Sequence, residues 1–154
     1  MSRVAPRRHR GHSLAPEHLG ERGAAAVLVI AIGGLALFIA AVAMTVSGLT
    51  FPSRYAGATP PPNVAQLGVG QVIGGIGLLV LGLLLVASAA ALLSGLPRSR
   101  PFAVGSAGLT AVLTGAAIVV LFGATRRDLV LLAALAVAFV AFGGAALILA
   151  RLRR

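Results

Sequence analysis

Four uninterrupted apolar segments dominate the pattern of hydrophobic and polar positions along the chain. They cover residues 24–49, 68–93, 102–123 and 129–150, and none contains a charged side chain. A helix needs roughly 20 apolar residues to cross a hydrocarbon layer about 30 Å thick, so each segment is long enough. None has the polar face of a helix on a soluble protein, and the pattern therefore predicts four transmembrane helices.

The connections between these segments predict how the helices are arranged. The links at 94–101 and 123–128 are short, so they should join helices that lie side by side in opposite directions. The expected fold is therefore all-α, an up-down antiparallel bundle of four transmembrane helices in residues 24–150. The loop at 50–67 is longer and contains the run Pro60–Pro62, which favours a stiff extended spacer. A recognition surface on this loop is the alternative.

The two ends of the chain differ from the apolar segments. Residues 1–23 have no apolar period and are rich in Arg, Pro, Gly and His, which predicts a disordered basic tail. Residues 151–154 form a second, short basic tail. The first apolar run is longer than the 7–15 residues typical of a signal peptide, so we interpret it as a retained anchor. The alternative is a cleaved signal peptide, because the small-residue stretch Ala41–Ala43 resembles a cleavage site.

Charge supports a membrane location and predicts an orientation. Hydrophobic residues make up 58% of the chain and charged residues 10%, against about 25% charged in soluble domains. Ten of the 13 basic residues, all arginines, lie in the two tails and the 94–101 link. The positive-inside rule then places both termini in the cytoplasm of a multi-pass cell-membrane protein.

The net charge of +10 raises the question of a nucleic-acid partner. Because the arginines flank apolar segments, we interpret them as topology signals and contacts to anionic lipid, and expect no nucleic acid. The predicted headgroup contacts are Arg7, Arg8, Arg10, Arg151, Arg153 and Arg154.

Chemistry-bearing residues are scarce. The chain has no Cys, and no Ser in an apolar segment shares that segment with a His or an acid. His9, His12 and His18 stand among cations in the N-terminal tail, which disfavours a bound metal ion. We therefore expect no enzyme activity, no cofactor and no metal site. The absence of Lys and the excess of Ala, Gly, Leu and Val suggest a GC-rich bacterial genome.

The stretch TRRD at 125–128 holds the only acid beyond Glu21. Asp128 directly precedes an apolar run, where a carboxylate can accept free backbone N–H groups of a helix start. We interpret Arg126, Arg127 and Asp128 as the mark of a turn at the membrane surface. A functional site would need a second acid or a His on the same side, and the sequence places none there.

Small residues recur at helical spacing within the apolar segments. Lipid is as apolar as Leu, so transmembrane helices associate through close packing of small residues. The partner is either another helix of this chain or another protomer. The predicted packing residues are Gly70, Gly74, Gly77, Ser88, Ala134, Ala138 and Ala141.

A few polar side chains interrupt the apolar segments. Ser106, Thr110 and Thr114 recur every four residues, so their hydroxyls can bond to carbonyls of their own helix or can line a polar path. Gln71 lies near the external end of the second segment, where it can bond to another helix or contact a substrate.

Two functional hypotheses follow from these features. The first is a structural or interaction subunit, or scaffold, that packs against other membrane proteins or against copies of itself. The alternative is an oligomeric pore or passive carrier for a small solute, which would use the stripe of Gln71, Ser106, Thr110 and Thr114. The direction in which that stripe points distinguishes the two.

Overall fold

The computed structural model describes residues 20–55, 57, 63–123 and 129–152. Within them, α1 (Gly20–Thr50) is followed by the short 3-10 helix η1 (Pro52–Tyr55), α2 (Val64–Leu93), α3 (Ser99–Phe122) and α4 (Leu129–Arg151), and there is no strand. All four α-helices are long and apolar enough to span a membrane, which confirms the predicted helical class. The predictions for residues 1–19 and for the turn at 124–128 lie outside the described residues.

Three helices begin earlier than the apolar pattern indicates. Residues 20–23 belong to α1, although the sequence assigned them to a disordered tail, and Glu21 in the first turn complements the positive end of the helix dipole. In α2 the start moves from 68 to Val64. For α3 the start moves from 102 to Ser99, because Pro101 is tolerated in a first turn, where its missing N–H would have no partner.

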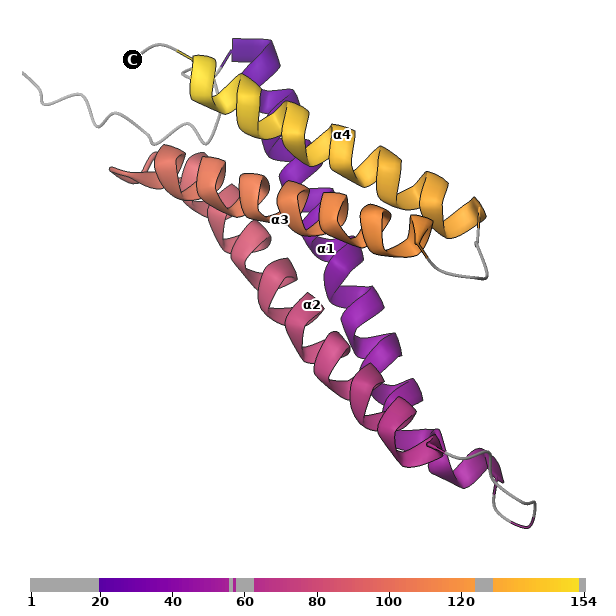
Figure 1. Cartoon of the computed structure of the whole chain (residues 1–154). Helices are drawn as coiled ribbons and strands as arrows, with labels where there is room; N and C mark the ends of the chain where they lie inside the picture. Colours follow the sequence, from indigo (N-terminus) through magenta and orange to yellow (C-terminus); the bar gives the residue numbers. More distant parts are fainter. Residues whose placement is uncertain (1–19, 56, 58–62, 124–128, 153–154) are drawn as a thin grey trace, which may run out of the picture.

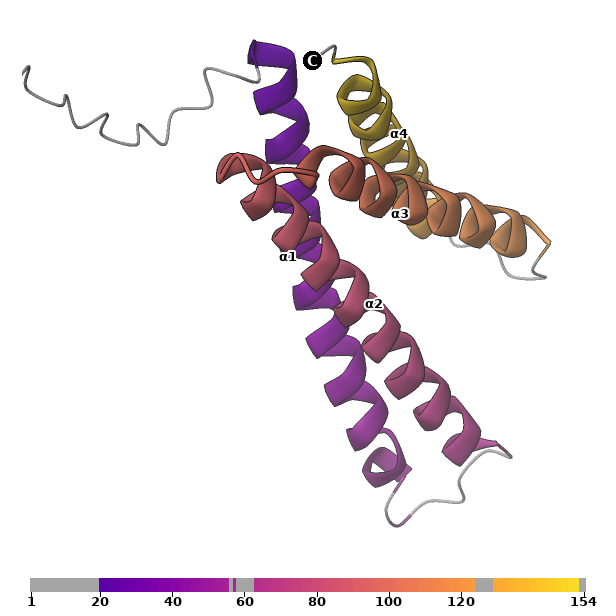
Figure 2. The same cartoon turned by 90° about the vertical axis from the view of Figure 1, so that its left-hand side faces the viewer.

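The helices pair into two antiparallel hairpins. Along the first hairpin, Gly34 of α1 faces Gly82 of α2, and Gly48 faces Gly68, so the two helices run in opposite directions. Figures 1 and 2 show α1 beside α2 and α3 beside α4, with the two pairs diverging from one shared end. The four helices therefore do not pack against one another along their whole lengths. This differs from the bundle predicted from the sequence.

The hydrophobic core lies at the shared end of the two hairpins, which we call the core end. It joins the start of α1, the end of α2, the start of α3 and the end of α4. Half of its members are alanines, which lets the helix backbones approach closely. The buried residues are Ala26, Val27, Ile30, Leu85, Ala89, Leu92, Ala103, Ala107, Ala111, Phe142, Ala145 and Leu149.

Beyond the core end, glycines hold α1 against α2. A Cβ added at Gly82 would lie 2.9 Å from both the carbonyl oxygen of Gly34 and the backbone nitrogen of Phe38. A Cβ at Gly48 would lie 2.8 Å from the carbonyl oxygen of Gly68. Neither site has room for a side chain, so the two backbones are in direct contact. The contact residues form the glycine seam: Gly34, Gly48, Gly68, Gly75 and Gly82.

Candidate functional site

Arginines gather at the core end. Arg22 lies in the first turn of α1, Arg98 precedes α3, Arg100 lies in the first turn of α3, and Arg151 ends α4. The packing of the four helices brings these segments together around the end of α4. The fifth described arginine, Arg54, lies in η1 at the opposite end of the α1–α2 hairpin.

Arg100 fastens the start of α3 to the end of α4. Its Nε donates a hydrogen bond of 2.6 Å to the carbonyl oxygen of Leu149, and its Nη2 donates one of 3.0 Å to that of Ala150. The last carbonyls of a helix have no partner within the helix. The cation therefore satisfies two of them and complements the negative end of the α4 dipole.

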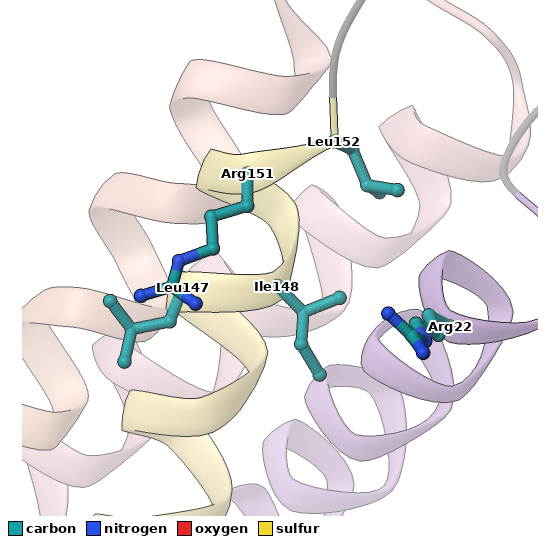
Figure 3. Close-up of a pocket in the computed structure, with 5 residues that line it drawn as sticks. All are labelled: Arg22, Leu147, Ile148, Arg151 and Leu152. Carbon is teal, nitrogen blue, oxygen red and sulfur yellow. The ribbon is translucent and has the colours of Figure 1, made fainter.

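Two pockets flank the last turn of α4. The first, which we call the Arg22–Arg151 pocket, has a volume of about 230 Å³ and lies between α1 and α4 (Figure 3). Its lining residues are Arg22, Leu147, Ile148, Arg151 and Leu152. The second, the Arg98–Arg100 pocket, has a volume of about 490 Å³ and lies between α3 and α4. Its lining residues are Leu96, Arg98, Ser99, Arg100, Pro101, Val104 and Ala150.

The hydroxyl stripe of α3 points into the core end. Ser106 and Thr110 are buried, and Thr114 is half-buried. The Thr110 hydroxyl donates to the carbonyl oxygen of Ser106 at 2.9 Å, and the Thr114 hydroxyl donates to the carbonyl oxygens of Thr110 and Ala111. Each threonine is thus satisfied by its own helix, which is the first of the two predicted arrangements.

Ser106 also makes a polar contact with a second helix. Its Oγ lies 3.1 Å from Oγ of Ser88, which is fully buried on α2. The Ser88 hydroxyl donates to the carbonyl oxygen of Leu85 at 2.8 Å, so Ser106 is the donor in the Ser106–Ser88 bond. It shares this proton with the carbonyl oxygen of Ala103, also at 3.1 Å. The bond connects the two hairpins within the core.

We expect the Ser88–Ser106 bond to contribute little to stability. Interhelical hydrogen bonds in membrane proteins average about 0.6 kcal/mol in double-mutant cycles. A cycle with Ser88→Ala, Ser106→Ala and the double variant should give a coupling free energy near that value, measured from unfolding in detergent. A coupling above about 2 kcal/mol would show that the pair is a main fastening between the hairpins.

Gln71 is half-buried on α2, far from the core end. Its side-chain oxygen Oε1 is buried and has no hydrogen-bond partner in the described part of the chain. The predicted interhelical bond is therefore not made by this oxygen. In the register that places Gly74 against Met44, Gln71 lies on the side of α2 that faces α1.

The predicted packing residues occupy different environments. Ser88 is buried, Ala138 and Ala141 are half-buried in α4, and Ala134 is exposed. On α2, Gly74 faces the methyl group of Met44, but nothing described lies within 4 Å of a Cβ added at Gly70 or Gly77.

The direct backbone contact between α1 and α2 lies next to the predicted residues, of which Gly74 also faces α1 through Met44. It is made by Gly68, Gly75 and Gly82, which are spaced by seven residues. Gly70 and Gly77 stay a prediction for contact with a partner molecule. The seven-residue spacing in α2 is matched in α1 by the buried Gly34, Ala41 and Gly48, and this paired repeat is the sequence signal that points to the seam.

Of the predicted headgroup contacts, the described residues include only Arg151, which is exposed at the core end. Arg7, Arg8, Arg10, Arg153 and Arg154 lie outside them, as do the three histidines. Sequence reasoning did not select Arg22 or Arg100 as individual contacts, although both stand next to apolar segments. In the described ranges no group of three or more potential metal ligands occurs.

Comparison with known proteins identified no relative of this chain. No family model matches the chain, and neither a curated protein nor a solved structure matches it.

Proposed function

We propose that this chain is a multi-pass protein of the cell membrane that acts as a structural or interaction subunit, packing against other membrane proteins or further copies of itself. The observation that carries the proposal is the way its polar groups are used. The hydroxyls of α3 are bonded inside the core end, while large apolar side chains cover the outside of all four helices. Such a surface favours contact with lipid and partner helices over catalysis.

The same observation bears on the alternative of a pore or passive carrier. A polar path would require the stripe to face water, and burial of Ser106 and Thr110 among alanines of the core favours a packing role for them. We therefore propose the interaction subunit, without enzyme activity, as the function.

The distribution of arginines supports the orientation. Four of the five described arginines lie at the core end, and the fifth lies at the far end of the α1–α2 hairpin. An excess of arginine in short segments beside spans is typical of the cytoplasmic side. We propose that the core end, with both termini, faces the cytoplasm and that the helices cross the membrane in alternating directions.

Labelling of single cysteines tests this orientation without interference, because the chain has no native Cys. Ser53 and Ser94 are both exposed and lie at opposite ends of the α1–α2 hairpin, in η1 and directly after α2. In intact cells, a membrane-impermeant maleimide should label Ser53→Cys, and it should label Ser94→Cys only after permeabilisation. Labelling of both positions from one side of a sealed membrane would contradict four crossings.

Affinity isolation in mild detergent tests the interaction role. We expect a defined membrane protein, or a second copy of the chain, to co-purify with the wild type. Gly70→Leu/Gly77→Leu should remove the co-purifying protein at unchanged stability, because nothing described lies within 4 Å of a Cβ added at either glycine. Gly105→Leu/Gly144→Leu is the matched control, since these glycines are equally open on other helices. Isolation of the chain alone and as a monomer would speak against the proposal.

A further inference from the structure

The Arg22–Arg151 pocket contains two arginines that do not fasten one described helix to another. In the part of the chain that the structure describes, neither guanidinium has an ion pair or a hydrogen bond. The single acid among the described residues, Glu21, does not line the pocket. Arg100 differs, because its guanidinium is occupied by two carbonyls. Two free cations thus share one pocket at the end of the helices.

The rest of the pocket lining is apolar. Figure 3 shows Ile148 between the guanidinium groups of Arg22 and Arg151, with the Arg151 side chain lying back along α4 toward Leu147. Leu147 is 59% exposed, so the pocket continues into an open apolar surface of α4. The lining changes from charged to hydrocarbon along a single helix turn.

We propose that the Arg22–Arg151 pocket binds an anionic phospholipid, with its headgroup phosphate reached by the two arginines from either side of Ile148 and the start of an acyl chain on Leu147, Ile148 and Leu152. The proposal deepens the proposed membrane role and rests on it. Basic pockets between transmembrane helices on the cytoplasmic side suit such headgroups. A guanidinium can donate two parallel hydrogen bonds to a phosphate.

Local dipoles support the same ligand charge. Arg22 lies in the first turn of α1, where the free N–H groups and the positive end of the dipole attract an anion. The negative end of the α4 dipole would oppose it. On the other side of that helix end, however, Arg100 occupies the carbonyls of Leu149 and Ala150 and offsets this charge.

The lining also favours an anionic phospholipid over two similar ligands. A free phosphate ion would gain nothing from the apolar side chains. A zwitterionic lipid such as phosphatidylcholine brings its own cation close to the phosphate, and that cation would meet the second arginine. A headgroup with a net negative charge is therefore the best match to two cations beside hydrocarbon.

Native mass spectrometry of the full chain in neutral detergent tests the site, with dioleoyl phosphatidylglycerol and dioleoyl phosphatidylcholine as probes. We expect the wild type to bind phosphatidylglycerol more tightly than phosphatidylcholine. Arg22→Gln should weaken binding of phosphatidylglycerol about fivefold, and Arg22→Gln/Arg151→Gln about thirtyfold. Arg98→Gln, which removes an equal charge from the neighbouring pocket, should leave this binding unchanged.

Two further arms separate the pocket from a general attraction of charges. Ile148→Trp fills the pocket and keeps both arginines, so it should also weaken binding of phosphatidylglycerol. Sodium phosphate at the lipid concentration should not displace the lipid. Equal losses in Arg22→Gln and Arg98→Gln, no loss in Ile148→Trp, or displacement by sodium phosphate would each overturn the proposal. The assay uses the chain alone, so failure of partner isolation leaves its result readable.

Discussion

Gly82→Ala should destabilise the α1–α2 hairpin by about 1–3 kcal/mol, which is the usual cost of overpacking a tight contact. The added methyl group would lie 2.9 Å from the Gly34 carbonyl oxygen and from the Phe38 backbone nitrogen. Both are backbone atoms, so no side-chain rotation can relieve the clash and the helices must move apart. The measurement is the temperature at which half of the detergent-purified protein leaves its main peak in size-exclusion chromatography.

Gly77→Ala is the matched control for this experiment. It adds the same methyl group to the same helix, at a position with nothing described within 4 Å. Alanine has the higher helix propensity, by up to about 1 kcal/mol, so this variant should match or exceed the stability of the wild type. If both variants melted alike, the glycine seam would not be the contact that holds α1 against α2.

Arg100→Ala should cost about 1.5–3 kcal/mol, the range for hydrogen bonds to charged groups. The variant leaves the carbonyl oxygens of Leu149 and Ala150 without their donor and separates the start of α3 from the end of α4. Amide hydrogen exchange in the last turn of α4 should accelerate along with the loss of thermal stability. Arg100→Lys should recover only part of the loss, because an ammonium group lacks the fork of two donors.

Arg98→Ala serves as the control for the Arg100 experiment. It removes an arginine two residues away, at an exposed position just before α3 that makes no side-chain hydrogen bond in the described chain. The variant should exchange and melt like the wild type. Equal effects at both positions would mean that net charge at this end of the molecule matters more than the two bonds.

The number and class of the helices could be predicted because the relevant signal is local. A charge-free run of sufficient length predicts a span without knowledge of its neighbours. The helix starts were less predictable, since residues 20–23 and 99–101 are helical although they are mostly polar, and Gln66 interrupts the apolar pattern at the start of α2. Whether such residues are helical depends on which residue types the first turn of a helix tolerates, as at Pro101.

The packing between the helices depends on information that no single helix contains. Gly70 and Gly77 are as small as Gly68 and Gly75, and only the position of α1 decides which pair faces it. The divergence of the two hairpins has the same origin. Nothing in the composition of α3 or α4 shows that their contacts with α1 and α2 are limited to the core end.

The candidate site combines predictable and unpredictable parts. An arginine beside an apolar segment is expected at a membrane surface, so Arg151 could be selected from sequence alone. The role of Arg22 depends on the approach of α1 to α4, and that of Arg100 on an interaction across 49 residues of chain. Only the folded arrangement shows that one of these arginines is occupied by the fold and the other is free.

The division into two hairpins has a consequence for biosynthesis. The first hairpin completes its own interface as soon as α2 has left the ribosome, because the glycine seam uses residues of α1 and α2 alone. The second hairpin needs only a docking step at one end. Synthesis from the N-terminus therefore allows the α1–α2 interface to be buried before the second hairpin is made.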